Sequence, residues 1–420
     1  MFKRLLGPRR TGLAELILVI TSILILLGTS VTRSNTPVPP PVLGKRPDPS
    51  PTPFNPTPES DPSPTFFSPT PDSDPCPANS IQRPVVYLPL MAGRQTPTPT
   101  QEKTTIPTPV DPCAHLVTRQ GDQFFLEGKP FPFVGTNVSY LMEDYFPEAE
   151  AEKAIAYLAA AGATALRVWL YPQHNLDRAA RLFDLGRKYG LRFVVTLENY
   201  YFDKGSWWFD NSTPYRTVYL PHVRRTVAHF RDRPEIMIWE LMNEPNCSGD
   251  TIGNCPDNMV RWAKAVSEEI KALDPCHLIS VGVIRIDPTA EHYERLHALP
   301  SIDVVSIHKG ADVWPSEEIE IARKLNKPVL IGEVYSEAYD KGCQRLYDRG
   351  EEKRAAIIAA DMARAWATGV DGYLLWQYGH GSIMVGKEIS HYCGIHDYMR
   401  DDPVWQILKA APVPRLPCSR

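Results

Sequence analysis

One apolar run of the chain ends abruptly in an amide, a carboxylate and a proline: Ile236-Met-Ile-Trp-Glu-Leu-Met-Asn243-Glu244-Pro245. A run of this kind predicts a strand that is covered on both faces, as in a parallel sheet. Proline stops such a strand because it has no N–H to donate to a neighbour. Packing alone does not explain the carboxylate at the end of the run. We therefore expect a buried strand of an α/β fold, with Glu244 as a functional residue.

Strand-like and helix-like segments alternate on both sides of this run. The eight predicted strands are Phe133–Asn137, Ala165–Leu170, Arg192–Glu198, Ile236–Asn243, Leu278–Val283, Val304–His308, Val329–Glu333 and Gly372–Trp376. Helices are predicted to begin near Glu148, Asp177, Tyr215, Asp257, Pro288, Ser316, Glu351 and Pro403. Eight strands, each followed by a helix, predict an α/β fold of the (β/α)8 TIM barrel type. A doubly wound open sheet also alternates, but the strand count and the absence of a Gly-rich phosphate loop after the first strand favour the barrel.

A hairpin is predicted ahead of the barrel. Two short apolar runs within residues 123–133 flank Glu127-Gly128, which is typical of a turn between two strands. We expect this hairpin to cap one end of the core.

Functional side chains of a TIM barrel gather at the carboxyl ends of its strands. The residues at these ends are Asn137, Arg167, Trp169, Glu198, Asn199, Asn243, Glu244, His308, Glu333, Trp376 and Gln377. Carboxylates can protonate a leaving oxygen or attack an anomeric carbon. Amides and histidine can bond hydroxyl groups, and indole rings can stack on the apolar face of a sugar. This set of residue types predicts sugar chemistry.

Several stretches together resemble the family 5 glycoside hydrolases, and the endo-β-1,4-mannanases in particular. They are Gly135-Thr-Asn137 with Tyr140-Leu-Met, Leu166-Arg-Val-Trp169, Trp239-Glu-Leu-Met-Asn-Glu-Pro245 followed by Cys247, Lys327-Pro-Val-Leu-Ile-Gly-Glu333, and Trp376-Gln377. The resemblance covers most of the predicted barrel. The Trp-Glu-Leu-x-Asn-Glu-Pro stretch is its most specific part.

The resemblance implies a role for each matching residue. Glu244 would be the general acid and base, and Glu333 the nucleophile of a retaining mechanism. Arg167 would hold Glu333 ionised, because a nearby cation lowers the pKa of a carboxylate. Asn243 would bond the 2-hydroxyl of the reacting sugar, and Trp376 would form the floor of that subsite.

The remaining substrate-binding predictions are less specific. They comprise Asn137, Trp169, Glu198, Asn199, His308 and Trp314. Glu198 and Asn199 fit equally well as a cap of the third strand.

The chain departs from the family pattern after the sixth strand. The family has a tyrosine two residues after its histidine, whereas this chain reads His308-Lys-Gly310-Ala-Asp-Val-Trp314. That tyrosine orients the nucleophile, so Tyr335 or Tyr201 is the expected substitute here.

The first third of the chain has another character. Residues 1–33 combine a basic head with an apolar run, which predicts either a cleaved export signal or a membrane anchor. Residues 34–112 form a Pro/Thr/Ser-rich linker, and 23 of the 42 prolines lie between Pro37 and Pro112. The barrel domain is predicted to span residues 113–420. The net charge of −4 shows no nucleic-acid signature.

Eight cysteines favour an exported protein. Cys247 and Cys255 are one expected pair. The other pairs considered are Cys113 with Cys418, Cys343 with Cys393, and Cys276 with Cys76, although spacing does not fix connectivity. No Cys-x-x-Cys pair or Cys/His cluster predicts a metal site.

Together these features predict a secreted or membrane-anchored retaining endo-glycosidase that hydrolyses β-1,4 bonds of mannan. We expect no cofactor or metal, no nucleic-acid partner and a monomer. A β-1,4-glucanase or an exo-acting relative is the nearest alternative. A non-catalytic carbohydrate-binding protein on a degenerate barrel is an alternative from another class, and Gly310 is the feature that favours it.

Overall fold

The computed structural model describes residues 113, 115–200, 206–209, 214–247, 254–284, 289–336, 350–385, 388–392 and 397–418. Eight parallel strands close into a barrel in the order β10-β11-β4-β5-β6-β7-β8-β9. The barrel strands are β4 (Phe133–Asn137), β5 (Ala165–Trp169), β6 (Arg192–Thr196), β7 (Ile236–Asn243), β8 (Leu278–Val283), β9 (Val304–Gly310), β10 (Val329–Tyr335) and β11 (Gly372–Leu375). The predicted (β/α)8 barrel is confirmed, and the open sheet is excluded.

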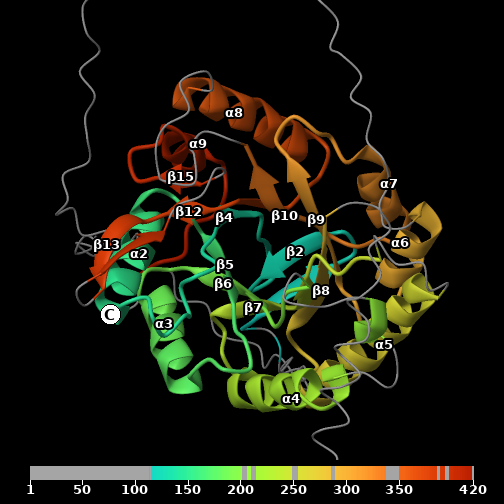
Figure 1. The fold of residues 1–420 in the computed structure, drawn as a ribbon. Helices are drawn as coiled ribbons and strands as arrows, with labels where there is room; N and C mark the ends of the chain where they lie inside the picture. Colours follow the sequence, from blue (N-terminus) through green and yellow to red (C-terminus); the bar gives the residue numbers. More distant parts are fainter. Residues whose placement is uncertain are drawn as a thin grey trace, which may run out of the picture. The chain divides into compact units, whose positions relative to one another are not determined.

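Helices form a layer around the strands (Figure 1). They are α2 (Glu148–Ala160), α3 (Leu176–Lys188), α4 (Tyr219–Phe230), α5 (Cys255–Leu273), α6 (Ala290–His297), α7 (Ser316–Lys324), α8 (Glu351–Ala367) and α9 (Val404–Ala410). Local signals set some of their starts. The side chain of Asn175, for example, accepts hydrogen bonds from the N–H groups of Asp177 and Arg178 and so caps α3.

The barrel interior is apolar at one end. A small sheet of β1 (Val117–Gln120), β2 (Gln123–Leu126) and β3 (Lys129–Pro130) supplies side chains to this region, as predicted for the hairpin. Phe124 and Phe131 of this segment join inward-facing residues such as Val194 and Leu330 in one buried cluster. The interior is therefore closed at the amino ends of the strands, and a substrate can enter only from the other end.

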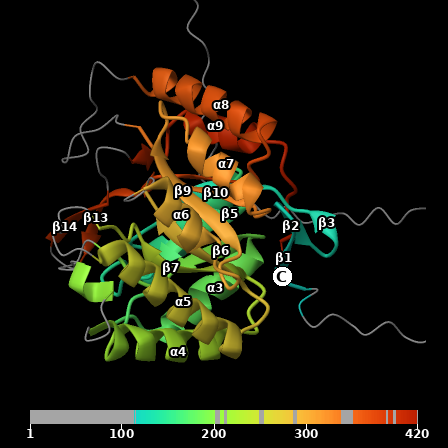
Figure 2. The ribbon, with the colours of Figure 1, turned by 90° about the vertical axis from the view of Figure 1, so that its right-hand side faces the viewer.

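Two small sheets of two strands each follow the barrel among the described residues. β12 (Tyr378–Gly379) pairs with β15 (Tyr398–Met399), and β13 (Gly381–Val385) pairs with β14 (Glu388–Tyr392). Figure 2 shows β13 and β14 at the opposite end of the barrel from β1–β3. The sequence predicted no strand after the eighth, because runs of two to five residues are too short for a clear alternation of apolar and polar positions.

Disulfides correct part of the sequence prediction. Cys247 pairs with Cys255 as expected. Cys113 pairs with Cys276, so the predicted Cys113–Cys418 and Cys76–Cys276 bridges are wrong. The reason is spatial: Cys276 lies in the turn before β8, and the chain that enters β1 runs past it. Cys343 and Cys393 lie outside the described residues.

Within the described part of the chain, no helix has the length and hydropathy needed to cross a bilayer. The segment predicted as signal or anchor and the Pro-rich linker lie outside that part.

Candidate active site

The carboxyl ends of five strands bring the predicted polar residues together. β4 ends in Asn137, β7 in Asn243, and β5, β9 and β10 contribute Arg167, His308 and Glu333. All of these side chains are buried. Glu244 follows β7 directly and is buried as well. Residues more than 190 positions apart in the sequence therefore meet in one small volume.

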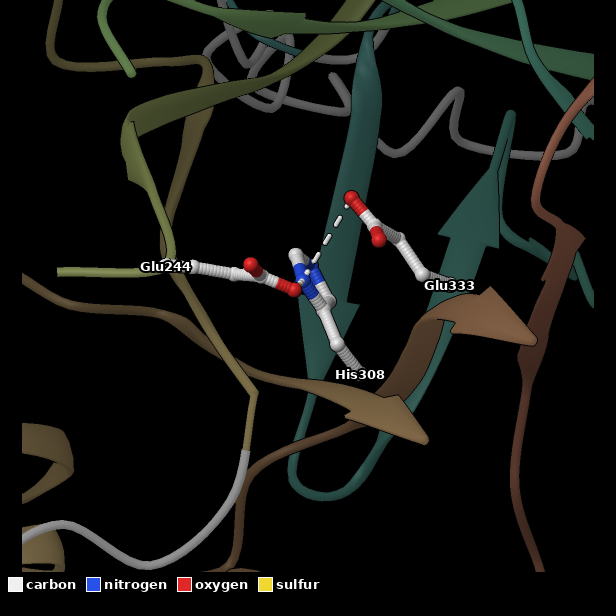
Figure 3. Close-up of side chains that lie close together, drawn as sticks. All are labelled: Glu244, His308 and Glu333. Carbon is white, nitrogen blue, oxygen red and sulfur yellow. Dashed lines mark hydrogen bonds and ion pairs between the residues drawn. The ribbon is translucent and has the colours of Figure 1, made fainter. Parts of the chain in front are cut away.

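Glu244 and Glu333 face each other across His308 (Figure 3). Nδ1 of His308 lies 3.0 Å from Oε1 of Glu244 and 3.4 Å from Oε1 of Glu333. One oxygen of each carboxylate and a ring nitrogen of the histidine all lie within 4.8 Å of one another. The two glutamates can therefore act on one bond of a bound molecule.

Arg167 lies beneath this pair and is completely buried. Its Nη1 donates to Oε1 of Glu333 at 2.6 Å and to Oδ1 of Asn137 at 2.9 Å. Its Nη2 donates to Oδ1 of Asn243 at 2.8 Å. The same guanidinium also contacts Glu240. The planar fork of donors thus fixes four side chains from three other strands at once.

The pKa of Glu333 lies above its ordinary value, although Arg167 lowers it. Burial raises the pKa of Glu333 to about 7, His308 and Arg167 oppose this shift, and the charge of Glu244 adds to it. Arg167 lowers the pKa of Glu333, but desolvation by burial is the larger effect, and Arg167 also pairs with Glu240. Since the charged form of Glu244 contributes to the shift, the value belongs to the last proton lost by the Glu244/Glu333 pair.

That proton has a preferred position. Arg167 donates to Glu333 at 2.6 Å, and the charges of Glu240 and Glu333 raise its own pKa. A carboxylate in direct contact with a guanidinium is the stronger acid of the two. We therefore assign the shared proton to Glu244 and the negative charge to Glu333.

The backbone at Glu244 is unusual. Its φ is +48°, in the left-handed region that a residue with a side chain seldom adopts. The N–H of Glu244 donates to the carbonyl of Gly282 at 2.6 Å, and its own carbonyl accepts from the side chain of Asn246 at 3.1 Å. The Cys247–Cys255 disulfide follows immediately. This conformation costs about 1–3 kcal/mol, and these contacts hold the chain in it.

Glycine before Glu333 has a steric cause. A Cβ at Gly332 would lie 2.7 Å from Oγ of Ser306 and 3.2 Å from Nε2 of His308. The carbonyl of Gly332 accepts from the side chain of Asn137 at 2.8 Å. The Gly-Glu pair thus lets β10 approach β9 closely enough to bring Glu333 next to His308.

The other predicted residues fall into two groups. Trp169 and Trp376 form an edge-to-face pair at 5.5 Å, and Trp169 lies over Arg167. Asn199 accepts from Asn243 at 3.3 Å, and Glu198 lies beside it. These four residues are thus linked to Arg167 or Asn243, which lie at the carboxylate pair.

Trp314 lies elsewhere. Its ring is stacked on Arg364 of α8 at 4.2 Å, with Nζ of Lys309 5.9 Å from the ring. Lys309 alternates with His308 on β9 and points to the helix layer, where it bonds Asp361 at 2.7 Å. The contacts described for Trp314 are therefore with the helix layer rather than with the carboxylates.

Tyr335 stands beside Gly310, as one of the two substitutes proposed for the missing tyrosine. The two residues are paired in the β9–β10 register. A Cβ at Gly310 would lie 3.6 Å from Cε2 of Tyr335. Tyr201, the other substitute, lies outside the described residues.

Glu240 was not among the residues predicted for the site. It lies in the middle of the apolar run and faces the barrel interior, because Trp239 faces outward to bond Asp274 at 2.8 Å. A lone carboxylate within a buried strand was the signal that could have identified it, since such a group needs a partner.

The Glu244/His308/Glu333 cluster also has the donor atoms of a small cation site. Arg167 already brings a positive charge within 2.6 Å of Glu333, which opposes a second cation there. The arrangement fits acid/base chemistry better.

Comparisons with known proteins agree with this geometry. Residues 196–327 match the family described as GH family 5 beta-mannosidase-like. "Mannan endo-1,4-beta-mannosidase 7" of Oryza sativa subsp. japonica is 24% identical over 339 residues, which cover 62% of this chain and 88% of that protein. "Probable mannan endo-1,4-beta-mannosidase C" of Aspergillus terreus is 26% identical over 368 residues, with coverages of 69% and 88%.

The resemblance to the family 5 glycoside hydrolases is confirmed. The predicted enzyme class is confirmed as well: the chain is a glycoside hydrolase. Among solved structures, the endo-1,4-beta-mannanase from Rhizomucor miehei matches with a TM-score of 0.56 and 20% sequence identity, covering 70% of this chain and 97% of that one. At that identity the structural match supports the barrel fold of the hydrolase.

The two tryptophans give a matched test of the binding surface. We expect Trp376→Ala to lower kcat/KM on a soluble β-linked polysaccharide by about tenfold or more, because it removes an indole next to the carboxylates. Trp314→Ala should lower the thermal stability of the hydrolase and leave KM unchanged, because its ring packs on Arg364. Steady-state kinetics and thermal unfolding of both variants distinguish the two roles. Equal losses of kcat/KM would show that the helix-layer contact of Trp314 is not its main role.

Proposed function

We propose that this hydrolase cleaves internal β-1,4 bonds of a mannan-type polysaccharide with retention at the anomeric carbon. The observation that carries the proposal is the close approach of Glu244 and Glu333, whose oxygens lie within 4.8 Å. Retaining glycosidases place their carboxyl groups about 5–5.5 Å apart, whereas inverting enzymes need roughly 6.5–9.5 Å to admit a water. The distance therefore favours attack by the enzyme itself.

Each residue of the pair would have one role in each half of the reaction. In the first half, Glu333 attacks the anomeric carbon while Glu244 gives its proton to the glycosidic oxygen, which leaves with the bond electrons. In the second half, Glu244 takes a proton from water, whose oxygen bonds to the anomeric carbon, and Glu333 leaves that carbon as a carboxylate with the bond electrons. Asn243 and Trp376 would hold the reacting sugar.

The substrate class is supported by the relatives. Both curated relatives quoted above carry names that specify mannan and internal β-1,4 bonds. Residues at the strand ends do not by themselves fix the orientation of a 2-hydroxyl group. Mannan is therefore proposed on similarity, and the cleavage chemistry on geometry.

Substitution of the two carboxylates tests the mechanism. We expect Glu244→Gln to lower kcat by about 10²–10⁴-fold, because proton donation is lost. Glu333→Gln should lower it at least as far, because no covalent intermediate can form. Glu320→Gln, in the exposed layer of α7, is the matched control and should act like the parent.

The measurement is the release of reducing ends and the size of the products from galactomannan, glucomannan, xylan and soluble cellulose. Proton NMR of the first product gives the anomeric configuration. Parent-like rates in either glutamine variant, or an inverted first product, would contradict the mechanism. Faster cleavage of cellulose than of mannan would contradict the substrate class.

The pair also predicts a pH dependence. The active form has one proton, on Glu244, and a charge on Glu333. Because burial raises the pKa of Glu333 to about 7, the pair loses its last proton as the pH rises through about 7. We therefore expect kcat/KM to fall above that pH, since the general acid is lost. A profile of kcat/KM that keeps rising above neutral pH would show that another group limits the reaction.

We also propose that the described barrel is the catalytic domain, residues 113–420, of an exported protein. The two disulfides support an oxidising compartment. Residues 1–33 would direct export, and residues 34–112 would form the tether. Fractionation of cells that express the full chain, with a protease added outside, tests this. Activity that stays inside and protected would exclude it.

A further inference from the structure

A third carboxylate lies under the catalytic pair. Glu240 is on β7, four residues before Glu244, and its side chain is completely buried. A buried carboxylate is costly unless it is paired and hydrogen-bonded. Glu240 has no direct place in the proposed reaction, so its presence needs another explanation.

Four donors hold Glu240 in place. Nε and Nη2 of Arg167 lie 2.7 and 2.5 Å from its Oε1. Thr196 donates to Oε1 at 3.0 Å, and Ser280 donates to Oε2 at 3.1 Å. A Cβ at Gly282 would lie 2.8 Å from Oε1, so the neighbouring strand also leaves room for this carboxylate. The site is built for an ionised group.

Glu240 and Glu333 compete for one guanidinium. Arg167 gives two of its nitrogens to Glu240 and one to Glu333. Burial raises the pKa of Glu240, but Arg167, His308 and Thr196 together outweigh this and hold it below its ordinary value. Glu240 therefore stays ionised, and only part of the Arg167 charge remains for Glu333.

We infer that Glu240 is a positioning residue that takes up part of the Arg167 charge and so lets Glu244 and Glu333 retain a shared proton. Without Glu240, the free charge of Arg167 would draw that proton off the pair. The inference rests on the proposed function and adds the group that sets its protonation state. The residue acts through Arg167 and does not touch the substrate.

The charged and titratable groups around the pair are few among the described residues. Arg167 comes from β5, Glu240 and Glu244 from β7 and its end, and His308 from β9. Tyr171, after β5, is close enough to feel the charges of Arg167 and Glu198. β10 contributes Glu333 itself, and β4, β6 and β8 contribute the uncharged groups Asn137, Thr196 and Ser280.

Glu240→Gln tests the inference, because it keeps the shape and an acceptor oxygen but removes the charge. We expect the basic limb of the kcat/KM profile on soluble mannan to move down by about one pH unit. Glu240→Asp keeps the charge but moves it away from Arg167, because the side chain is one methylene shorter. The basic limb of this variant should lie between the limbs of the parent and of Glu240→Gln. The Asp variant decides the question by itself if the Gln variant does not fold.

Asp274→Asn is the matched control. Asp274 is also a buried carboxylate and contacts the outward neighbour of Glu240, the indole N–H of Trp239. The Asp274→Asn variant should be less stable than the parent, but the basic limb of its kcat/KM profile should lie at the same pH as in the parent. An unmoved limb in the folded Glu240 variants, or an equal movement in Asp274→Asn, would overturn the inference.

A second readout needs no substrate. The pair keeps a proton in the folded state up to about pH 7, whereas an unfolded glutamate loses it near 4.5. The folded state binds more protons in this window, so stability falls as the pH rises through it. We expect this fall to end about one unit lower in Glu240→Gln.

Thermal unfolding at a series of pH values measures the second readout. Glu351 and Asp371 titrate in the same range, but they make no contact with Glu240 and cancel in the difference between variants. If the parent releases no sugar, the proposed function fails while unfolding still tests the inference. If the parent is active and both readouts stay unmoved, the inference alone fails.

Discussion

The guanidinium of Arg167 is the point on which the active site depends. It is completely buried, and the described partners of its charge and its donors are side chains from three other strands. An unpaired buried charge is far too costly to keep, so the strands must arrive in register for the barrel to be stable. The same contacts orient Glu333 and Asn243. Folding and positioning of the catalytic groups are therefore one process here.

Electrostatics and backbone geometry at the barrel mouth support one another. Glu240 stays ionised next to Arg167 and takes up part of its charge. Glu244 and Glu333 therefore keep one proton between them, which the reaction can use. Glu244 reaches that pair because the chain turns in the left-handed region at its position. The hydrogen bond to Gly282 and the nearby disulfide stabilise this turn. Strain of this kind is typical of functional sites, where the surrounding contacts fix it.

Much of the fold could be predicted, because continuous apolar runs mark strands that are covered on both faces. The limits of β4, β7 and β8 match the sequence prediction residue for residue, and the other five differ by one or two residues at their ends. β9, for example, extends beyond the predicted end at His308. It includes the polar residue Lys309, whose side chain bonds Asp361 in the helix layer. Cysteine pairing was partly wrong for a similar reason, since the partner of Cys113 is set by where the chain passes and not by spacing.

Sequence by itself determined the strands, the residues at their ends and the chemistry that those residue types allow. Only the tertiary structure decided which carboxylates pair with the same guanidinium. Arg167 was expected to ionise Glu333, but Glu240 takes part of that charge from the opposite side. Trp314 was expected at the cleft, but its described contacts are with α8. The physical reason is that local patterns encode burial and periodicity, whereas a pKa or a stacking partner depends on distances between residues far apart in the chain.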